Sequence, residues 1–118
     1  MNDRELMKLA AGAAGLYVCS DLEHLGLKEW GPDLWVKEDK FGNYRKWNPL
    51  DDDGDALRLA VQLDLLIYSY SAEQKCVAKW SGSGMSVEYW HWNDNQGQGP
   101  AMRRAIVRAA AEIGKAIP

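Results

Sequence analysis

The stretch 75-KCVAKWSGSGMSVEYWHW-92 decides the fold class of this chain, because two β-prone runs flank a turn of alternating serine and glycine. Glycine adopts backbone conformations that other residues avoid, which suits residues 81–84 to a tight connection. We therefore predict a β-hairpin with strands over residues 75–80 and 85–92. Neither face of the second strand is cleanly polar, because bulky apolar residues alternate onto both faces.

A helix is predicted directly after this hairpin. Residues 93–99 form a polar loop that contains glycine, and Pro100 stands where we expect the first helical position, at which a missing N–H is tolerated. The apolar residues that recur at helical spacing and should be buried are Met102, Ile106, Ala109, Ile113 and Ile117. The charged residues of the opposite side are Arg104, Arg108, Glu112 and Lys115. This periodicity predicts an amphipathic helix that runs to about Ala116.

Upstream of residue 75 the chain contains a second predicted helix. An acidic cluster at 51–55 supplies a cap and first-turn carboxylates for a helix that begins near Asp53. Its apolar arc is wider than a one-sided surface helix needs and contains Ala56, Leu57, Leu59, Ala60, Val61, Leu63 and Leu65. We therefore expect this helix to be well buried. Residues 66–70 are β-branched and aromatic, and they predict a strand as the helix ends.

The first half of the chain predicts one further helix and one further hairpin. Leu6, Leu9, Ala10 and Ala13 lie at helical spacing within 2–14, and Gly15 ends that segment. Residues 16–19 form a short apolar run with strand character. The β-prone runs 34–37 and 44–47 flank Phe-Gly-Asn at 41–43, which predicts a hairpin.

The order helix, hairpin, helix, hairpin, helix predicts an α+β fold. We expect about three helices packed on a mainly antiparallel sheet of hairpins, in two or three layers. A chain of 118 residues, 47% of them hydrophobic, suits one hydrophobic core. We therefore expect a single domain over residues 1–118.

Composition excludes several classes of protein. The formal net charge of −3 provides no global basic field, which argues against bulk nucleic-acid binding. The N-terminus is polar and acidic, unlike a signal peptide, and no apolar run reaches the roughly 18 residues of a membrane helix. Cys19 and Cys76 are far apart and belong to no CxxC motif. We expect a cytoplasmic protein with reduced cysteines and no membrane contact.

Motifs that signal catalysis or metal binding fail on spacing. The acidic run that starts at Asp51 resembles an EF-hand loop, but Ala56 and Gln62 occupy the positions that require glycine and glutamate. His24 and His91 have no partner at zinc-site spacing. The serines at 81 and 83 fit a turn and do not form a nucleophile elbow. We therefore expect no catalytic residue, no metal and no cofactor, and we expect that the protein is not an enzyme.

The segment 97–104 is a candidate anion site. Gly97 and Gly99 precede a helix N-terminus, where free N–H groups attract an anion, and Arg103 and Arg104 would add positive charge. The alternative is that these residues only cap and solvate the helix. Aromatic residues that would contact the same ligand are Trp90, His91 and Trp92. A structural histidine and core tryptophans are the alternative interpretation of these three.

Two motifs resemble a known group of small proteins. These are KWNP at 46–49 followed by Asp55-Ala56, and the terminal GPAMRRAIV at 99–107 after a tryptophan-containing strand. The opening ELMKLA at 5–10 and AAG at 13–15 are also similar to this group. The chain resembles phage and prophage proteins of the phage α/β/α-sandwich domain, or NinX-like, group. The resemblance implies a compact accessory protein and carries over no catalytic residues. The acidic insert at 51–55 and the loop at 93–99 depart from the group's pattern.

Two functions follow from these features. The first is a phage- or prophage-encoded accessory protein that binds a host protein without catalysis, for example as an inhibitor of a host process, through its tryptophan-rich sheet. The second is a binder that sequesters a small anionic ligand of nucleotide type at 97–104. A homo-oligomer is compatible with either.

Overall fold

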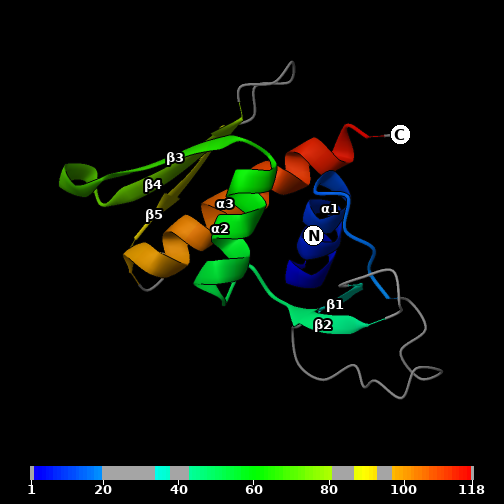
Figure 1. Cartoon of the computed structure of the whole chain (residues 1–118). Helices are drawn as coiled ribbons and strands as arrows, with labels where there is room; N and C mark the ends of the chain where they lie inside the picture. Colours follow the sequence, from blue (N-terminus) through cyan, green and yellow to red (C-terminus); the bar gives the residue numbers. More distant parts are fainter. Residues whose placement is uncertain (1, 20–33, 38–42, 81–86, 93–96, 118) are drawn as a thin grey trace.

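The computed structural model describes residues 2–19, 34–37, 43–80, 87–92 and 97–117. Its helices are α1 (Asp3–Ala13), α2 (Asp53–Gln62) and α3 (Gln98–Lys115), with a short 3₁₀ turn, η1 (Ser71–Glu73). Its strands are β1 (Leu34–Lys37), β2 (Tyr44–Trp47), β3 (Leu65–Tyr70), β4 (Lys75–Trp80) and β5 (Val87–His91). The predicted α+β class is confirmed (Figure 1).

The described strands form two separate antiparallel sheets instead of the single sheet that we predicted. One is the hairpin β1–β2, and the other has the order β3-β4-β5. The strand predicted over 85–92 ends one residue earlier than predicted, since β5 (Val87–His91) ends at His91; residues 81–86 lie outside the described part. The two sheets lie apart, with the helices between them (Figure 1).

Helix α3 is the centre of the fold and packs against α1, α2 and the three-stranded sheet. It is buried around most of its circumference because α1, α2 and the three-stranded sheet surround it. Most of its buried side chains are alanines, which let these elements approach the helix closely. Its buried residues are Ala101, Ala105, Ile106, Val107, Ala109, Ala110, Ala111 and Ile113. The predicted stripe is thus confirmed at Ile106, Ala109 and Ile113, whereas Met102 is half-buried. Ile117 lies beyond the helix and is 51% exposed, so its predicted burial is wrong.

The start of α3 also differs from the prediction. Gly97 caps the helix with a φ of +122°, which glycine tolerates, and the helix begins at Gln98. Pro100 is therefore the third helical residue and not the first. No intrahelical bond is lost, because the first one runs from the N–H of Ala101 to the carbonyl of Gly97 over 3.2 Å.

Helix α1 packs closely against α3. It begins with a capping box. The side chain of Asn2 accepts a hydrogen bond from the backbone N–H of Glu5, and the side chain of Glu5 accepts one from the backbone N–H of Asn2. Its buried residues are Leu6, Met7, Ala10 and Ala11, whereas the predicted Leu9 and Ala13 are half-buried. Gly114 of α3 lies directly against the backbone of Leu9, so the two helices touch where one of them lacks a side chain.

The hairpin β1–β2 has the predicted bounds, and Leu34 pairs with Trp47 at its base. Val18 forms an isolated antiparallel bridge with Val36, supported by the bond from the N–H of Cys19 to the carbonyl of Trp35. The predicted strand over 16–19 is thus a single bridge at the edge of this hairpin.

Helix α2 begins where predicted but is less buried than its composition indicated. Asp52 caps it, and Ala56, Leu59 and Ala60 face the core. Leu57 and Val61 are 55% and 68% exposed, so the prediction of a well-buried helix is wrong. The reason is that α2 packs on α3 along one side only. Leu65 belongs to β3, because the chain leaves the helix through a left-handed residue at Asp64, with a φ of +53°.

Candidate functional site

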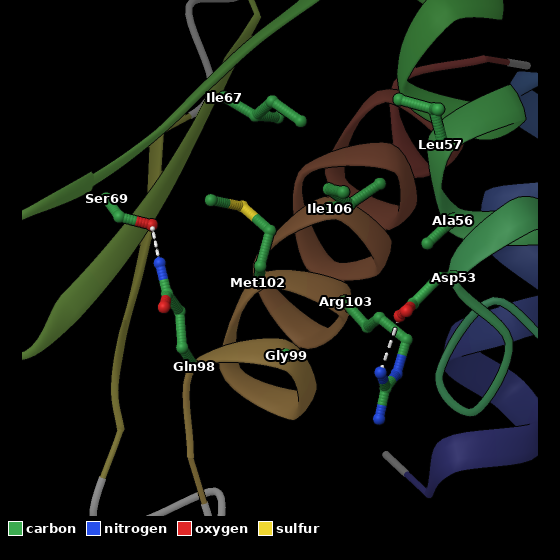
Figure 2. A pocket seen from close by; sticks show the side chains of 10 residues that line it. All are labelled: Asp53, Ala56, Leu57, Ile67, Ser69, Gln98, Gly99, Met102, Arg103 and Ile106. Carbon is green, nitrogen blue, oxygen red and sulfur yellow. Dashed lines mark hydrogen bonds and ion pairs between the residues drawn. The ribbon is translucent and has the colours of Figure 1, made fainter.

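A groove lies between α2 and β3, with α3 as its floor (Figure 2). We name it the α2–β3 groove, and its volume is about 350 Å³. Its lining residues are Asp53, Ala56 and Leu57 of α2, Ile67 and Ser69 of β3, and Gln98, Gly99, Met102, Arg103 and Ile106 of α3. All three elements therefore contribute residues to it.

Most of the groove surface is apolar. Ile67 of β3 and Leu57 of α2 stand on opposite walls, and Met102 and Ile106 project from the floor between them (Figure 2). Ile106 is buried, whereas Ile67 and Met102 are half-buried and Leu57 is mostly exposed. The flexible thioether of Met102 can adapt to the shape of a bound group. The arrangement suits large apolar side chains that enter from solvent.

Two polar contacts close the end of the groove next to the start of α3 (Figure 2). The guanidinium Nη1 of Arg103 lies 2.6 Å from the carboxylate Oδ1 of Asp53. Its Nε also donates to the carbonyl of Leu50 over 2.9 Å. On the other wall, the side-chain amide of Gln98 donates to the hydroxyl of Ser69 over 3.0 Å. The guanidinium is therefore fixed in place and already neutralised by a carboxylate.

The residues predicted for an anion site do not all meet at this groove. Gly99 and Arg103 line it, and a Cβ atom at Gly99 would lie 3.3 Å from Nη1 of Arg103. Gly97 caps the helix just outside. Arg104 does not line the groove, because it donates two hydrogen bonds of 3.0 Å to the two carboxylate oxygens of Asp3. The hydrogen bonds from Arg104 hold the pKa of Asp3 below its ordinary value.

The aromatic candidates are only partly described. The indole N–H of Trp92 donates to the Sγ of Cys76 over 3.2 Å, so the polar edge of this ring is turned towards the buried thiol. The side chains of Trp90 and His91 lie outside the described residues, although their backbone belongs to β5. Trp92 is half-buried, and its backbone N–H donates to the carbonyl of Gln74, so both its ring and its backbone are hydrogen-bonded within the fold.

The described residues contain neither a metal cluster nor a membrane-spanning helix. No group of three or more histidine, cysteine, aspartate or glutamate side chains within them could hold a metal ion. No helix in the same part of the chain is long and apolar enough to cross a membrane. In the groove itself, the functional groups of the lining are one hydroxyl, one amide, one carboxylate and one guanidinium.

Sequence reasoning missed the apolar part of this site. The sequence pattern predicts helix or strand for Leu57, Ile67, Met102 and Ser69, and it predicts none of them in the wall of a cavity. The one available signal was the apolar arc of 53–65, which exceeds what a helix packed on one side can bury. Such an excess indicates either deep burial or an exposed apolar surface, and the structure places Leu57 on the exposed surface.

Comparisons with protein-family models, with curated proteins and with solved structures found no match for this chain.

Proposed function

We propose that this chain is a non-enzymatic binding protein that contacts a partner protein through the α2–β3 groove. The observation that carries the proposal is the 55% exposure of Leu57 on the wall of an apolar groove. Val61, one turn further along α2 and outside the lining, is 68% exposed. Single exposed apolar side chains are common on protein surfaces, but a cluster beside an apolar concavity is typical of interaction sites. Water leaves this surface when a partner's side chains fill it, which favours binding.

The pairing of charges supports a protein partner over a nucleotide. A phosphate needs free donors, yet Arg103 is paired with Asp53 and Arg104 with Asp3. A nucleotide phosphate at the groove would have to break the ion pair between Asp53 and Arg103, because Arg103 is the one guanidinium in the described lining. The indole of Trp92 is also engaged with Cys76. These contacts agree better with the alternative in which 97–104 caps and solvates α3.

The chemistry of the lining supports binding without catalysis. Ser69 is the one hydroxyl among the described lining residues, and its hydrogen-bond neighbours are the side-chain amide of Gln98 and, at 3.6 Å, the Sγ of Cys76. Neither neighbour is the imidazole or carboxylate that activates a serine nucleophile. The carboxylate of Asp53 is engaged by Arg103. A phage or prophage origin, and hence a host protein as the partner, rests on the resemblance of the sequence motifs and stays a prediction.

A photoreactive amino acid at position 57 should give a discrete protein adduct in lysate of the natural host, identified by mass spectrometry. The same amino acid at Tyr17, which is 59% exposed on a different surface, is the matched control and should give no such adduct. Introducing Met102→Glu should abolish the adduct by placing a charge on the groove floor. An adduct that persists in that variant, in a chain with unchanged circular dichroism, would refute the groove as the contact site.

Calorimetry with mono-, di- and cyclic nucleotides tests the competing function. We expect no binding heat from the unmodified protein, because both arginines are already paired. Binding that is lost in the Arg103→Ala/Arg104→Ala double variant would instead establish the nucleotide function. A scan of thermal unfolding would show that the double variant remains folded.

A further inference from the structure

Strand β3 is an edge strand, and its outer side borders the α2–β3 groove. In the sheet order β3-β4-β5 it pairs with β4 alone, and α2 packs on its other side. Every second residue of such a strand directs its N–H and carbonyl groups away from the neighbouring strand. Within the described part of the chain, no backbone hydrogen bond links residues 65–69 to any element besides β4. The outer side of these residues therefore has backbone donors and acceptors that the fold leaves unused.

The sequence of β3 lacks the features that keep an edge strand from pairing. Lysine, proline and bulges are the usual ones. β3 reads LLIYSY, without charge or proline, and all of it pairs in unbroken register with β4. Ile67 and Ser69 line the groove, whereas Leu66, on the opposite face of the strand, is 59% exposed. An uncharged, β-prone edge of this kind is a template for another strand.

We infer that the partner occupies the α2–β3 groove as an extended segment, which pairs with the outer side of β3 as a fourth strand. This inference rests on the proposed function and adds the conformation and sequence pattern of the bound segment. Side chains of a strand alternate between the two faces of a sheet, so every second residue of the segment faces the apolar floor at Met102 and Ile106 (Figure 2). The residues between them lie on the solvent side, as Leu66 does. The segment therefore alternates large apolar with polar residues.

The position of α2 favours a segment of a partner over β3 of a second copy of this chain. Because α2 ends at Gln62 and β3 begins at Leu65, each copy has its own α2 next to this edge. Pairing two copies through β3 would bring two such helices to the same region. A single extended segment adds only its own backbone and side chains.

Two panels of peptides of about eight residues test this inference against the full chain. Both contain the same large apolar residues and threonines. In one panel they alternate, and in the other the apolar residues recur at the three- and four-residue spacing of a helix. We expect the alternating panel to bind about tenfold more tightly in fluorescence anisotropy, because only an extended backbone reaches the unused donors and acceptors of β3.

N-methylation of the best alternating peptide separates backbone pairing from apolar contact. Methyl groups on every second amide remove the N–H groups that point to β3 in one register, and those that point away from it in the other. The first peptide should lose about tenfold or more in affinity, whereas the second should bind almost as before.

Amide hydrogen exchange of residues 65–69, followed by NMR, reads the same contact from the protein. In the free chain, alternate amides should exchange quickly while those bonded to β4 exchange slowly. The alternating peptide should slow the fast set by about tenfold or more, and the peptide with the blocked register should not.

The results separate this inference from the proposed function. Equal or tighter binding of the helical panel, or equal losses from the two N-methylated peptides, overturns the extended segment while groove binding stands. A free protein that sediments as a dimer and exchanges slowly throughout residues 65–69 assigns the edge to a second copy and also overturns the inference. A protein adduct at position 57 without binding of the alternating panel overturns the inference alone. Failure of the adduct and of both panels overturns the proposed function together with the inference.

Discussion

Gly114→Ala is expected to lower the free energy of unfolding by about 3 kcal/mol, because the new methyl group has no space. A Cβ atom at this position would overlap the carbonyl oxygen of Leu9 and lie 2.8 Å from its carbonyl carbon. The obstacle is helix backbone, so α1 and α3 must move apart along a contact of small, fully buried side chains. Chemical denaturation followed by circular dichroism measures the change.

Gly12→Ala is the matched control for this prediction. Gly12 also lies within a helix, but a Cβ atom there has nothing within 4 Å. Alanine should therefore stabilise α1 by up to about 1 kcal/mol through its higher helix propensity. If the two substitutions have the same effect on stability, the close contact between α1 and α3 is not as described.

Asp55→Asn is expected to be the most damaging change in the acidic run, with a cost of about 3 kcal/mol. Asp55 is 5% exposed, and its carboxylate accepts from the backbone N–H of Asn48 over 3.0 Å. It also accepts from Arg45 over 3.1 Å and from Arg58 over 2.7 Å. These bonds join the end of β2 to the first turn of α2, and an amide cannot reproduce the charge that both guanidinium groups require.

The lowered pKa of Asp55 predicts how the free energy of unfolding depends on pH. Burial raises the pKa of Asp55, but the hydrogen bonds from Asn48, Arg58 and Arg45 outweigh it, so the pKa stays below the ordinary value of 3.8. A pKa that is lower in the folded state contributes stability above the unfolded pKa and loses it as pH falls through the folded value. The stability gap between the unmodified protein and Asp55→Asn should therefore narrow below about pH 4.

Asp51→Asn controls for the loss of one negative charge. Asp51 belongs to the same run and is exposed, so its replacement should change stability by less than about 0.5 kcal/mol at neutral pH. The role assigned to Asp55 would be contradicted if Asp51→Asn and Asp55→Asn lowered the free energy of unfolding by similar amounts. It would also be contradicted if the stability difference between the unmodified protein and Asp55→Asn stayed constant from neutral to acid pH.

The acidic run illustrates how far the sequence predicts the site. The helix cap at the start of α2 follows from local chemistry, because aspartate next to a helical segment accepts from its first N–H groups. Within the same run, Asp51 is exposed to solvent, whereas Asp55 is buried. The difference arises from tertiary contacts, because the backbone N–H of Asn48 and the side chain of Arg45 donate to the carboxylate of Asp55.

The sequence by itself determined the α+β class, the bounds of β1, β2 and β4, and the approximate extent of the three helices. These features depend on periodicity, turn residues and caps, which act between residues a few positions apart. Only the tertiary structure decided that Leu57 stays exposed on a groove wall, that Arg104 pairs with Asp3, and that Gly114 meets Leu9. Each of these depends on which elements pack together, and helix periodicity identifies an apolar face without specifying what covers it.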